Sequence, residues 1–369
     1  MAIYIVNFIS NMLLGLIFFS NGANIDSNAL NKRKKIYLFI TMLQFGLVCG
    51  FRSISVGWDT ETYAYIFSKV PDTWDKIFEN NMYIETGFSV FCSVIKILGG
   101  SYQTMFIISS LFVMGSCCIF IYRHSENVVL SVFIIISFPF YYSSFDIIRH
   151  FMVTAFFLLG YKYIEERKFW KYLLYIFLGS LFHSFAWVFL AFYFVRKIKW
   201  NAVVFISAIV ATAFCYFYIE DIAIWLSELI GKSSGVESGW IGEYGGGIKT
   251  ALMYGVVFIM AVVAYGNIEN KTLDDMNAVN LILILFIFSI LFINARQMTR
   301  LIMTSVPLMA IAIPKLINSK KIQDVRSYYI LILGFVFIGI IYHIFMLSVS
   351  WQSVVPYVPY WKMQGDYYI

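Results

Sequence analysis

Charged residues are scarce in this sequence of 369 residues: Asp, Glu, Lys and Arg together make up only 13%. A soluble protein of this length carries about twice that fraction. Hydrophobic residues make up 60% of the chain and aromatic residues 20%, and the mean hydropathy is +0.77. The composition therefore argues against a soluble domain and indicates an integral membrane protein. The net charge of +6 is too small to suggest nucleic acid as a partner.

Metal-ligand and nucleotide-binding motifs are also missing from the sequence. The five cysteines lie in or beside apolar runs, and adjacent Cys117 and Cys118 cannot readily form a disulfide with each other. There is no P-loop and no glycine-rich dinucleotide loop after a strand. The lack of an internal repeat weakens the case for a transporter built from inverted halves. We therefore expect neither a metal nor a cofactor.

Long apolar runs recur along the chain, each near the roughly 20 residues that a membrane helix needs. They predict an all-α polytopic membrane protein, a single integral-membrane domain over residues 1–369 with about 11 to 12 transmembrane helices. Residues 169–196 are too long for one span and predict two short or broken helices that meet near His183. Residues 85–99 predict a re-entrant or interfacial segment. The expected spans are 3–19, 36–51, 104–122, 128–143, 146–164, 200–219, 248–266, 277–294, 299–317 and 327–349.

Basic residues gather in the loops on one side of this expected topology. That side holds 17 of the 27 Lys and Arg, so the positive-inside rule predicts that it is cytoplasmic. The other side holds 13 of the 21 acidic residues and is expected to face outward. It would carry an outer loop with short helices (52–103), a Gly-rich outer loop (220–247) and an outer C-terminal tail (351–369).

Polar residues that loop solvation does not explain fall almost all on this outer side. A charged group at membrane depth costs roughly 2.5–3.5 kcal/mol on insertion scales, so it usually faces a polar cavity or a partner. Several such groups on one face predict a single site for an anionic ligand. The residues are Arg52, Asp59, Glu61, Glu85, Asp146, Arg149, His183, Arg296 and Arg300.

Several of these residues also have a plain structural interpretation. Arg52 could anchor the end of a span, and Asp146 and Arg149, three residues apart, could pair on one helix face. His183 interrupts an apolar run, and a lone intramembrane histidine is more often a hydrogen-bonded core residue than a catalyst. The remaining histidines have no clustered partners in the sequence and are expected to be structural: His124, His150 and His343.

Arg296 and Arg300 are harder to explain in this way. On a continuous helix they stack as like charges, which is unfavourable without an anion between them. If a turn intervenes, Arg300 lies at a helix N-terminus, where the dipole and the free N–H groups favour an anion. Two guanidinium groups suit phosphate oxygens, so the pair favours a phosphate-bearing ligand.

Four short motifs, in order along the chain, resemble those of a known family. Phe51-Arg52, followed by Val56-Gly57-Trp58-Asp59-Thr60 and then by Tyr63 and Phe67, is similar to the opening motif of the EpsG-like, Wzy-type polysaccharide polymerases. The second motif is an Arg-Gln pair in the family, and here it is Arg149 followed by His150 in place of Gln. The third, Phe182-His183-Ser184, is similar to a Phe-His-x-Ser motif, and the fourth is the late basic pair Arg296 and Arg300.

The resemblance implies a membrane-embedded glycosyltransferase with a GT-C-like fold. Such an enzyme joins oligosaccharide repeat units carried on undecaprenyl diphosphate, at the outer (periplasmic) face of the bacterial cytoplasmic (inner) membrane. The product is the O-antigen of lipopolysaccharide, a capsule or an exopolysaccharide. The implied partners are the lipid-linked donor and acceptor, the membrane lipid and a chain-length regulator. The donor is already activated, so no nucleotide site or cofactor is needed.

Roles follow from the resemblance together with the clustering on the outer side. Arg149, Arg296 and Arg300 are expected to bind the diphosphate, and Arg52 helps them or orders the loop. A base must take the proton of the acceptor hydroxyl. The candidates, in order, are Asp59, His183 and Glu85.

Three other functions compete with this hypothesis. A ligase that attaches finished polymer to a lipid acceptor would share the donor, the face and the use of arginine. A flippase for lipid-linked oligosaccharides also needs a cationic cavity, but it would carry its charge in a central chamber and usually shows two related halves. A membrane O-acyltransferase would need an intramembrane histidine on the cytoplasmic side, whereas His183 is expected on the outer side.

Overall fold

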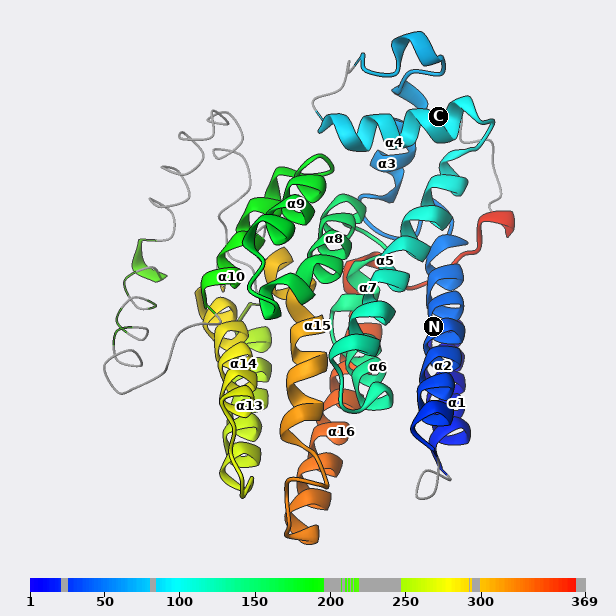
Figure 1. Ribbon diagram of the computed structural model, residues 1–369. Helices are drawn as coiled ribbons and strands as arrows, with labels where there is room; N and C mark the ends of the chain where they lie inside the picture. The colour runs from blue at the N-terminus through cyan, green and yellow to red at the C-terminus, as the bar shows by residue number, and fades with distance from the viewer. Residues whose placement is uncertain are drawn as a thin grey trace. The chain divides into compact units, whose positions relative to one another are not determined.

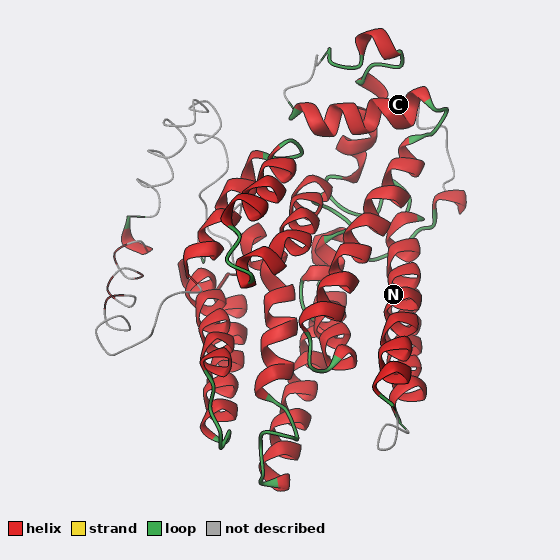
Figure 2. Cartoon of the chain, viewed as in Figure 1, coloured by secondary structure: helices red, strands yellow, loops and turns green. Residues whose placement is uncertain are grey.

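The computed structural model describes residues 1–20, 26–79, 84–195, seven positions between 207 and 218, 247–291, 293 and 299–362. Within these residues the secondary structure is helical and no strand is present (Figure 2), which confirms the all-α class. Four expectations lie wholly or largely outside the described residues: the span at 200–219, the Gly-rich loop at 220–247, Arg296 and the last part of the tail, 363–369.

The chain divides into two compact units. The first comprises Met1–Tyr193 and Ile338–Ile369, and the second comprises Phe194–Phe337. The long helix α16 (Val325–Ser348) begins in the second unit and ends in the first. Five of the predicted site residues, Arg52, Asp59, Glu85, Arg149 and His183, belong to the first unit.

Six of the described helices are long and apolar enough to cross a membrane, which makes the chain a multi-pass membrane protein. Two further helices, α2 (Ser27–Gly50) and α8 (Ile148–Glu165), have comparable lengths and carry basic residues. The expected total of about 11 to 12 spans stays a prediction. The six are α1 (Ala2–Phe19), α5 (Tyr102–His124), α13 (Gly247–Gly266), α14 (Leu273–Leu291), α15 (Thr299–Leu316) and α16.

Buried polar side chains join α1 to its neighbours in the first unit. Asn11 donates to the Thr41 hydroxyl at 3.0 Å and accepts from the Tyr37 hydroxyl at 2.9 Å, both on α2. Asn7 donates to the Tyr141 hydroxyl at 2.9 Å. Polar groups inside a bilayer must find partners within the protein, so this network stabilises the packing of α1 although the helix is mostly apolar.

Two of the expected spans are broken into shorter helices. Residues 128–143 form α6 (Val128–Ser137) and α7 (Phe140–Ser143), so the prediction of one continuous span here is wrong. Pro139 lies at the break, where its missing N–H and its ring prevent the helix from continuing. Residues 169–195 form α9 (Phe169–Ser180), the 3₁₀ helix η3 (Ser184–Leu190) and α10 (Ala191–Val195), which confirms the expected break near His183.

Short helices also fill the segment between α2 and α5. They are α3 (Thr60–Lys69), the 3₁₀ helix η2 (Trp74–Lys76) and α4 (Thr86–Ile97). The 12 residues of α4 extend about 18 Å, well short of the hydrocarbon thickness of about 30 Å. Figure 1 shows α4 lying crosswise to the long helices α2 and α5. Its length and direction suit a re-entrant or interfacial segment better than a span.

In the second unit, α13, α14 and α15 pack against one another. The connections at one end are tied together by a bridge between Ile268 and Ile322. Lys321 adds an ion pair to Asp275 at 2.8 Å. These contacts join the α13–α14 connection and the start of α14 to the segment between α15 and α16.

Residues 351–362 fold back onto the segment that follows α2. The backbones pair at an isolated bridge between Arg52 and Pro359, with Ser53 N–H donating to Val358 O at 2.8 Å. The Tyr357 hydroxyl also donates to the carbonyl of Val48 at 2.9 Å. We call residues 351–362 the strap, because they hold the start of the 52–103 segment from one side.

Candidate functional site

The motif Val56-Gly57-Trp58-Asp59-Thr60 forms a tight turn between the strap and α8. Gly57 has φ +102°, and a Cβ at this position would lie 2.5 Å from the Thr60 hydroxyl and 3.0 Å from the Phe145 carbonyl. Such a backbone favours glycine, so the motif requires Gly57 for both conformation and space. The Thr60 hydroxyl closes the turn by donating to Val56 O at 2.7 Å.

The same turn is fastened to the residues just before α8. The backbone N–H of Asp59 donates to Asp146 Oδ1 at 2.5 Å, and Asp146 is only 2% exposed. Asp59 itself is partly exposed and lies at the start of α3. The opening motif therefore sets the position of the N-terminal end of α8, where Arg149 and His150 lie.

Glu85 is the centre of the candidate site. Its Oε2 accepts a hydrogen bond from Arg149 Nη1 at 2.6 Å, and its Oε1 accepts from the backbone N–H of Ser184 at 3.0 Å. The side chains of Glu85 and Arg149 are 19% and 21% exposed. One carboxylate thus joins three distant parts of the sequence: the start of α4, the start of α8 and the break between α9 and η3.

His183 lies at the start of η3, beside Glu85. Its Nδ1 accepts the backbone N–H of Phe185 at 3.1 Å and is 3.6 Å from Glu85 Oε1. The ring of His150 packs on the ring of His183, with their centroids 4.1 Å apart. His183 is partly exposed and His150 is buried, so the pair extends inward from the surface of the site.

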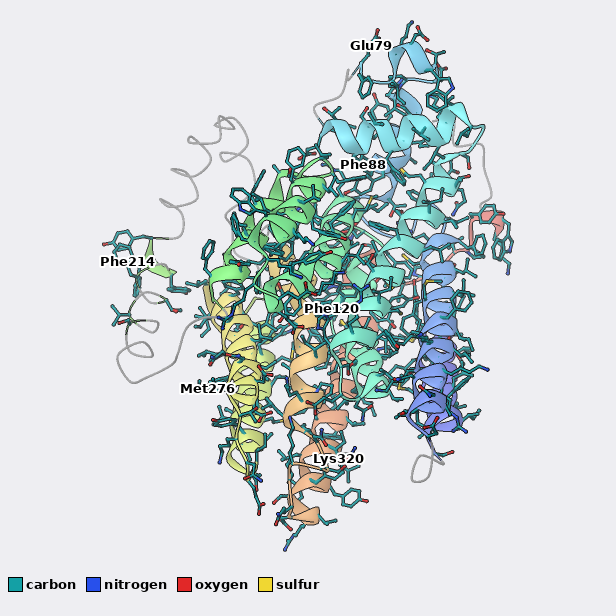
Figure 3. All side chains as sticks on the ribbon, viewed as in Figure 1. Glu79, Phe88, Phe120, Phe214, Met276 and Lys320 are labelled. Carbon is teal, nitrogen blue, oxygen red and sulfur yellow. The ribbon has the colours of Figure 1, made fainter. Side chains whose placement is uncertain are left out.

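Close backbone packing brings Glu85 to this position. A Cβ at Gly87 would lie 2.6 Å from both the Cβ and the carbonyl oxygen of Leu181. Only a glycine allows the first turn of α4 to approach the α9–η3 break so closely. Phe88, labelled in Figure 3, is fully buried on the same helix, and the Arg149 guanidinium lies 6.0 Å from its ring centroid.

The electrostatics of the site favour an ionised Glu85. Burial raises the pKa of Glu85, but His183 (when it is protonated), the Ser184 N–H and Arg149 lower it, and the net result is below the usual value. Tyr63 on α3 lies close to Arg149. Burial raises the pKa of the Tyr63 hydroxyl, and Arg149 opposes that rise. At neutral pH, Glu85 is therefore a carboxylate and Tyr63 a neutral hydroxyl.

Arg52 lies apart from the Glu85 centre and is fully buried. Its Nη1 donates to the Cys49 carbonyl at 2.6 Å, and the guanidinium lies over the rings of Phe106 and Phe145 at 4.6 and 5.6 Å. Among the described residues, its Nε and Nη2 have no hydrogen-bond partner. Whether Arg52 helps to bind the diphosphate or orders the loop stays a prediction.

The predicted site residues thus fall into three groups. Glu85, Arg149 and His183 are brought into direct contact, and Asp59 is tied to the same region through Asp146. Arg300 belongs to the second unit, in the first turn of α15, which begins at Thr299. Arg296 lies outside the described residues. Binding of the diphosphate by Arg296 and Arg300 stays a prediction.

Two residues of the site, His150 and Tyr63, were not among the predicted site residues. The expectation that His150 lacks a clustered partner is wrong, because its ring contacts that of His183. Tyr63 belongs to the opening motif, but no role was predicted for it. The signal for His150 was its position next to Arg149, since a helix that directs one of these side chains toward a site brings the other near it.

The donor set of the site does not resemble a metal centre. Among the described residues, no group of three or more His, Cys, Asp and Glu side chains is placed to hold a metal ion. The arrangement instead offers a guanidinium, two imidazoles and a carboxylate already engaged with the guanidinium. These groups suit anion binding and proton transfer.

Comparisons with known proteins give one match. The family model described as EpsG family matches residues 35–358, a range that includes the whole of the site described above. No curated protein and no solved structure matches the chain.

Proposed function

The chain belongs to the EpsG family, and on that premise we propose that it polymerises oligosaccharide repeat units carried on undecaprenyl diphosphate. The family suggests a membrane protein of polysaccharide biosynthesis that works on lipid-linked saccharides. The polymerase activity, the undecaprenyl carrier and a site on the outer face of the cytoplasmic membrane are our proposal. The product is O-antigen, capsule or exopolysaccharide.

In the proposed step, a hydroxyl oxygen of the acceptor sugar bonds to the anomeric carbon of the donor chain. The bond between that carbon and the diphosphate oxygen breaks, and its electron pair stays on the diphosphate. The diphosphate leaves on its undecaprenyl lipid, and the proton of the acceptor hydroxyl passes to a base. The protein must therefore bind a diphosphate that is dianionic in the donor and gains a further negative charge as it leaves, and it must accept one proton.

The contacts of Glu85 with Arg149 on one side and His183 on the other are the observation that carries this proposal. A guanidinium and a histidine lie together at the N-terminal end of α8, at the side that the basic loops predict to face outward. Glu85 holds Arg149 by one carboxylate oxygen, so the guanidinium keeps other N–H groups for phosphate oxygens. In this proposal Arg149 binds the diphosphate and Glu85 positions Arg149.

Asp59, His183 and Glu85 were the candidates for the base. The contacts of Glu85 count against it, because both of its oxygens accept hydrogen bonds and its lowered pKa makes the carboxylate a weak base. Asp59 is partly exposed and lies on the turn that fixes the start of α8. We keep Asp59 as the first candidate, and His183 is considered below.

The test uses purified protein in nanodiscs with an extracted lipid-linked repeat unit, with and without EDTA, analysed on a gel. Polymerase activity gives a ladder of multimers. Arg149→Ala should abolish the ladder, and Arg149→Lys should weaken it, because an ammonium lacks the two-pronged geometry of a guanidinium. The control is Arg326→Ala, at an exposed position near the start of α16.

Each other outcome points to a different function. A full ladder from Arg149→Ala would overturn the assignment of Arg149. Transfer of finished polymer to a second lipid acceptor, without a ladder, would identify a ligase. Movement of the intact repeat unit across proteoliposome membranes, without any transfer, would identify a flippase and leave the arginines as a binding site only.

A further inference from the structure

The hydrogen bonds of His183 determine which of its ring nitrogens carries a proton. Nδ1 accepts the backbone N–H of Phe185 at 3.1 Å, so it must present a lone pair. In a neutral imidazole the proton then belongs to Nε2. His183 in this conformation is therefore an acceptor toward its own backbone and a donor at its other nitrogen.

Glu85 could hold Nδ1 only in a different protonation state. Its Oε1 is 3.6 Å from Nδ1, beyond hydrogen-bonding distance, and already accepts the Ser184 N–H at 3.0 Å. A proton on Nδ1 would make this nitrogen a donor toward Glu85. The Nδ1–H group would then repel the backbone N–H of Phe185, which now donates to Nδ1. The cap on Phe185 therefore favours the neutral ring.

The charged and titratable groups around the ring agree with a neutral form. His150 faces it from α8 and Glu85 faces it from the start of α4, and Arg149 is bound to the other oxygen of the Glu85 carboxylate. The charge of Glu85 is already matched by Arg149 at 2.6 Å. The buried His150 ring, 4.1 Å away, gives no compensation for a second positive charge.

We propose that His183 acts as a neutral hydrogen-bond donor, through Nε2–H, to an oxygen of the departing lipid diphosphate, and not as the general base. This inference rests on the function proposed above. The proton stays on Nε2 throughout, so His183 stabilises the charge that develops as the anomeric C–O bond breaks. The acceptor hydroxyl must then give its proton to another group, for which Asp59 is the candidate.

Two substitutions separate a donor from a base. In His183→Gln, the side-chain amide reaches about as far as Nε2 and supplies N–H donors, but it cannot act as a base at neutral pH. In His183→Asn, the side-chain oxygen can cap the Phe185 N–H, as asparagine commonly does at helix starts, but no donor reaches the position of Nε2. The Gln variant therefore keeps the hydrogen-bond donor of His183, and the Asn variant keeps its cap on Phe185.

The activity test compares their rates of ladder formation with that of the wild-type protein. We expect His183→Gln to keep activity within about tenfold and His183→Asn to lose about 100-fold or more, the usual effect of removing one donor to a developing oxyanion. Equal losses in both variants, with loss of the acidic limb of the wild-type pH–rate profile, would identify His183 as the base and overturn the proposal.

A measurement without substrate tests the protonation state directly. ¹⁵N NMR of histidine-labelled protein in nanodiscs reports which ring nitrogen carries the proton, and the chain has only four histidines. The ¹⁵N signal that is present in the wild-type spectrum and absent from the spectrum of His183→Asn belongs to His183. We expect the neutral Nε2–H form from about pH 7 to about pH 8; a cationic ring or an Nδ1–H form there would overturn the inference. If the wild-type protein makes no ladder but the NMR result holds, only the proposed function fails.

Discussion

Arg149 and Glu85 form an ion pair across 64 residues of sequence, with Nη1 2.6 Å from Oε2 and both side chains about four-fifths buried. Removing one partner of such a pair usually costs more than the pair itself contributes, because it leaves a buried charge without compensation. The pair is therefore better understood as a means of placing Arg149 than as a source of stability.

Glu85→Gln should lower activity while the protein stays folded. The amide still offers an oxygen to the Ser184 N–H, but it loses the charge that holds Arg149. We expect a loss of about 1–3 kcal/mol in the free energy of unfolding and a clear fall in the rate of ladder formation. Thermal unfolding and the nanodisc assay measure the two effects. Glu61→Gln, at an exposed position on α3, is the matched control and should change neither.

The dependence of stability on pH follows from the lowered pKa of Glu85. A carboxyl group whose pKa is lower in the folded state stabilises that state above its unfolded pKa of about 4.3, and this contribution disappears as the pH falls through the folded value. The stability difference between wild type and Glu85→Gln should therefore persist from about pH 8 down to about pH 5 and shrink only below about pH 4. Thermal unfolding of both proteins across this range measures it. A difference that vanishes already near pH 6 would contradict the assignment.

Gly57→Ala should be much more harmful than Gly99→Ala. Both glycines have positive φ, +102° and +81°, so alanine meets an unfavourable backbone conformation at either position. A Cβ at Gly99 has no neighbour within 4 Å, whereas one at Gly57 collides with Thr60 and Phe145. We expect a loss of about 1–2 kcal/mol for Gly99→Ala from conformation alone and about 3–5 kcal/mol for Gly57→Ala. Similar losses in chemical unfolding would show that the turn can move aside.

His150 should act on the site by packing and not by titration. His150→Phe keeps a flat ring against His183 and is expected to retain most activity with an unchanged pH profile. His150→Ala removes the ring and should lower activity by releasing the orientation of His183. The nanodisc assay at several pH values distinguishes the two. An altered pH profile in His150→Phe would show that His150 itself exchanges protons during the reaction.

Hydropathy located the membrane helices well but not their ends. The apolar run 36–51 marks the second helix, yet α2 begins at Ser27, where the Asp26 side chain accepts the N–H of Asn28 at 3.2 Å. Lys and Arg are good helix formers, so a helix runs on through a basic segment that hydropathy excludes. The break inside 128–143 could have been predicted, because Pro139 lies within the run.

The ion-pair partner of Arg149 could not be predicted from the sequence. Spacing suggested a pair between Asp146 and Arg149, but α8 begins at Ile148, so Asp146 precedes the helix and the usual three-residue spacing does not apply. Arg149 instead pairs with Glu85, and Asp146 accepts the N–H of Asp59. The sequence therefore identified most of the polar residues of the site, whereas their pairing depends on how α4 and η3 pack.

The strap determines how late in synthesis the native contacts of the opening motif can form. Residues 353–359 pair with residues 52–57, which leave the ribosome about 300 residues earlier. Closing so long a loop costs entropy that only the finished contacts repay, so these contacts form late. Until then the motif turn lacks its support on one side. A nascent or prematurely terminated chain thus carries every residue of the Glu85 centre without the contacts that hold the neighbouring segment in place.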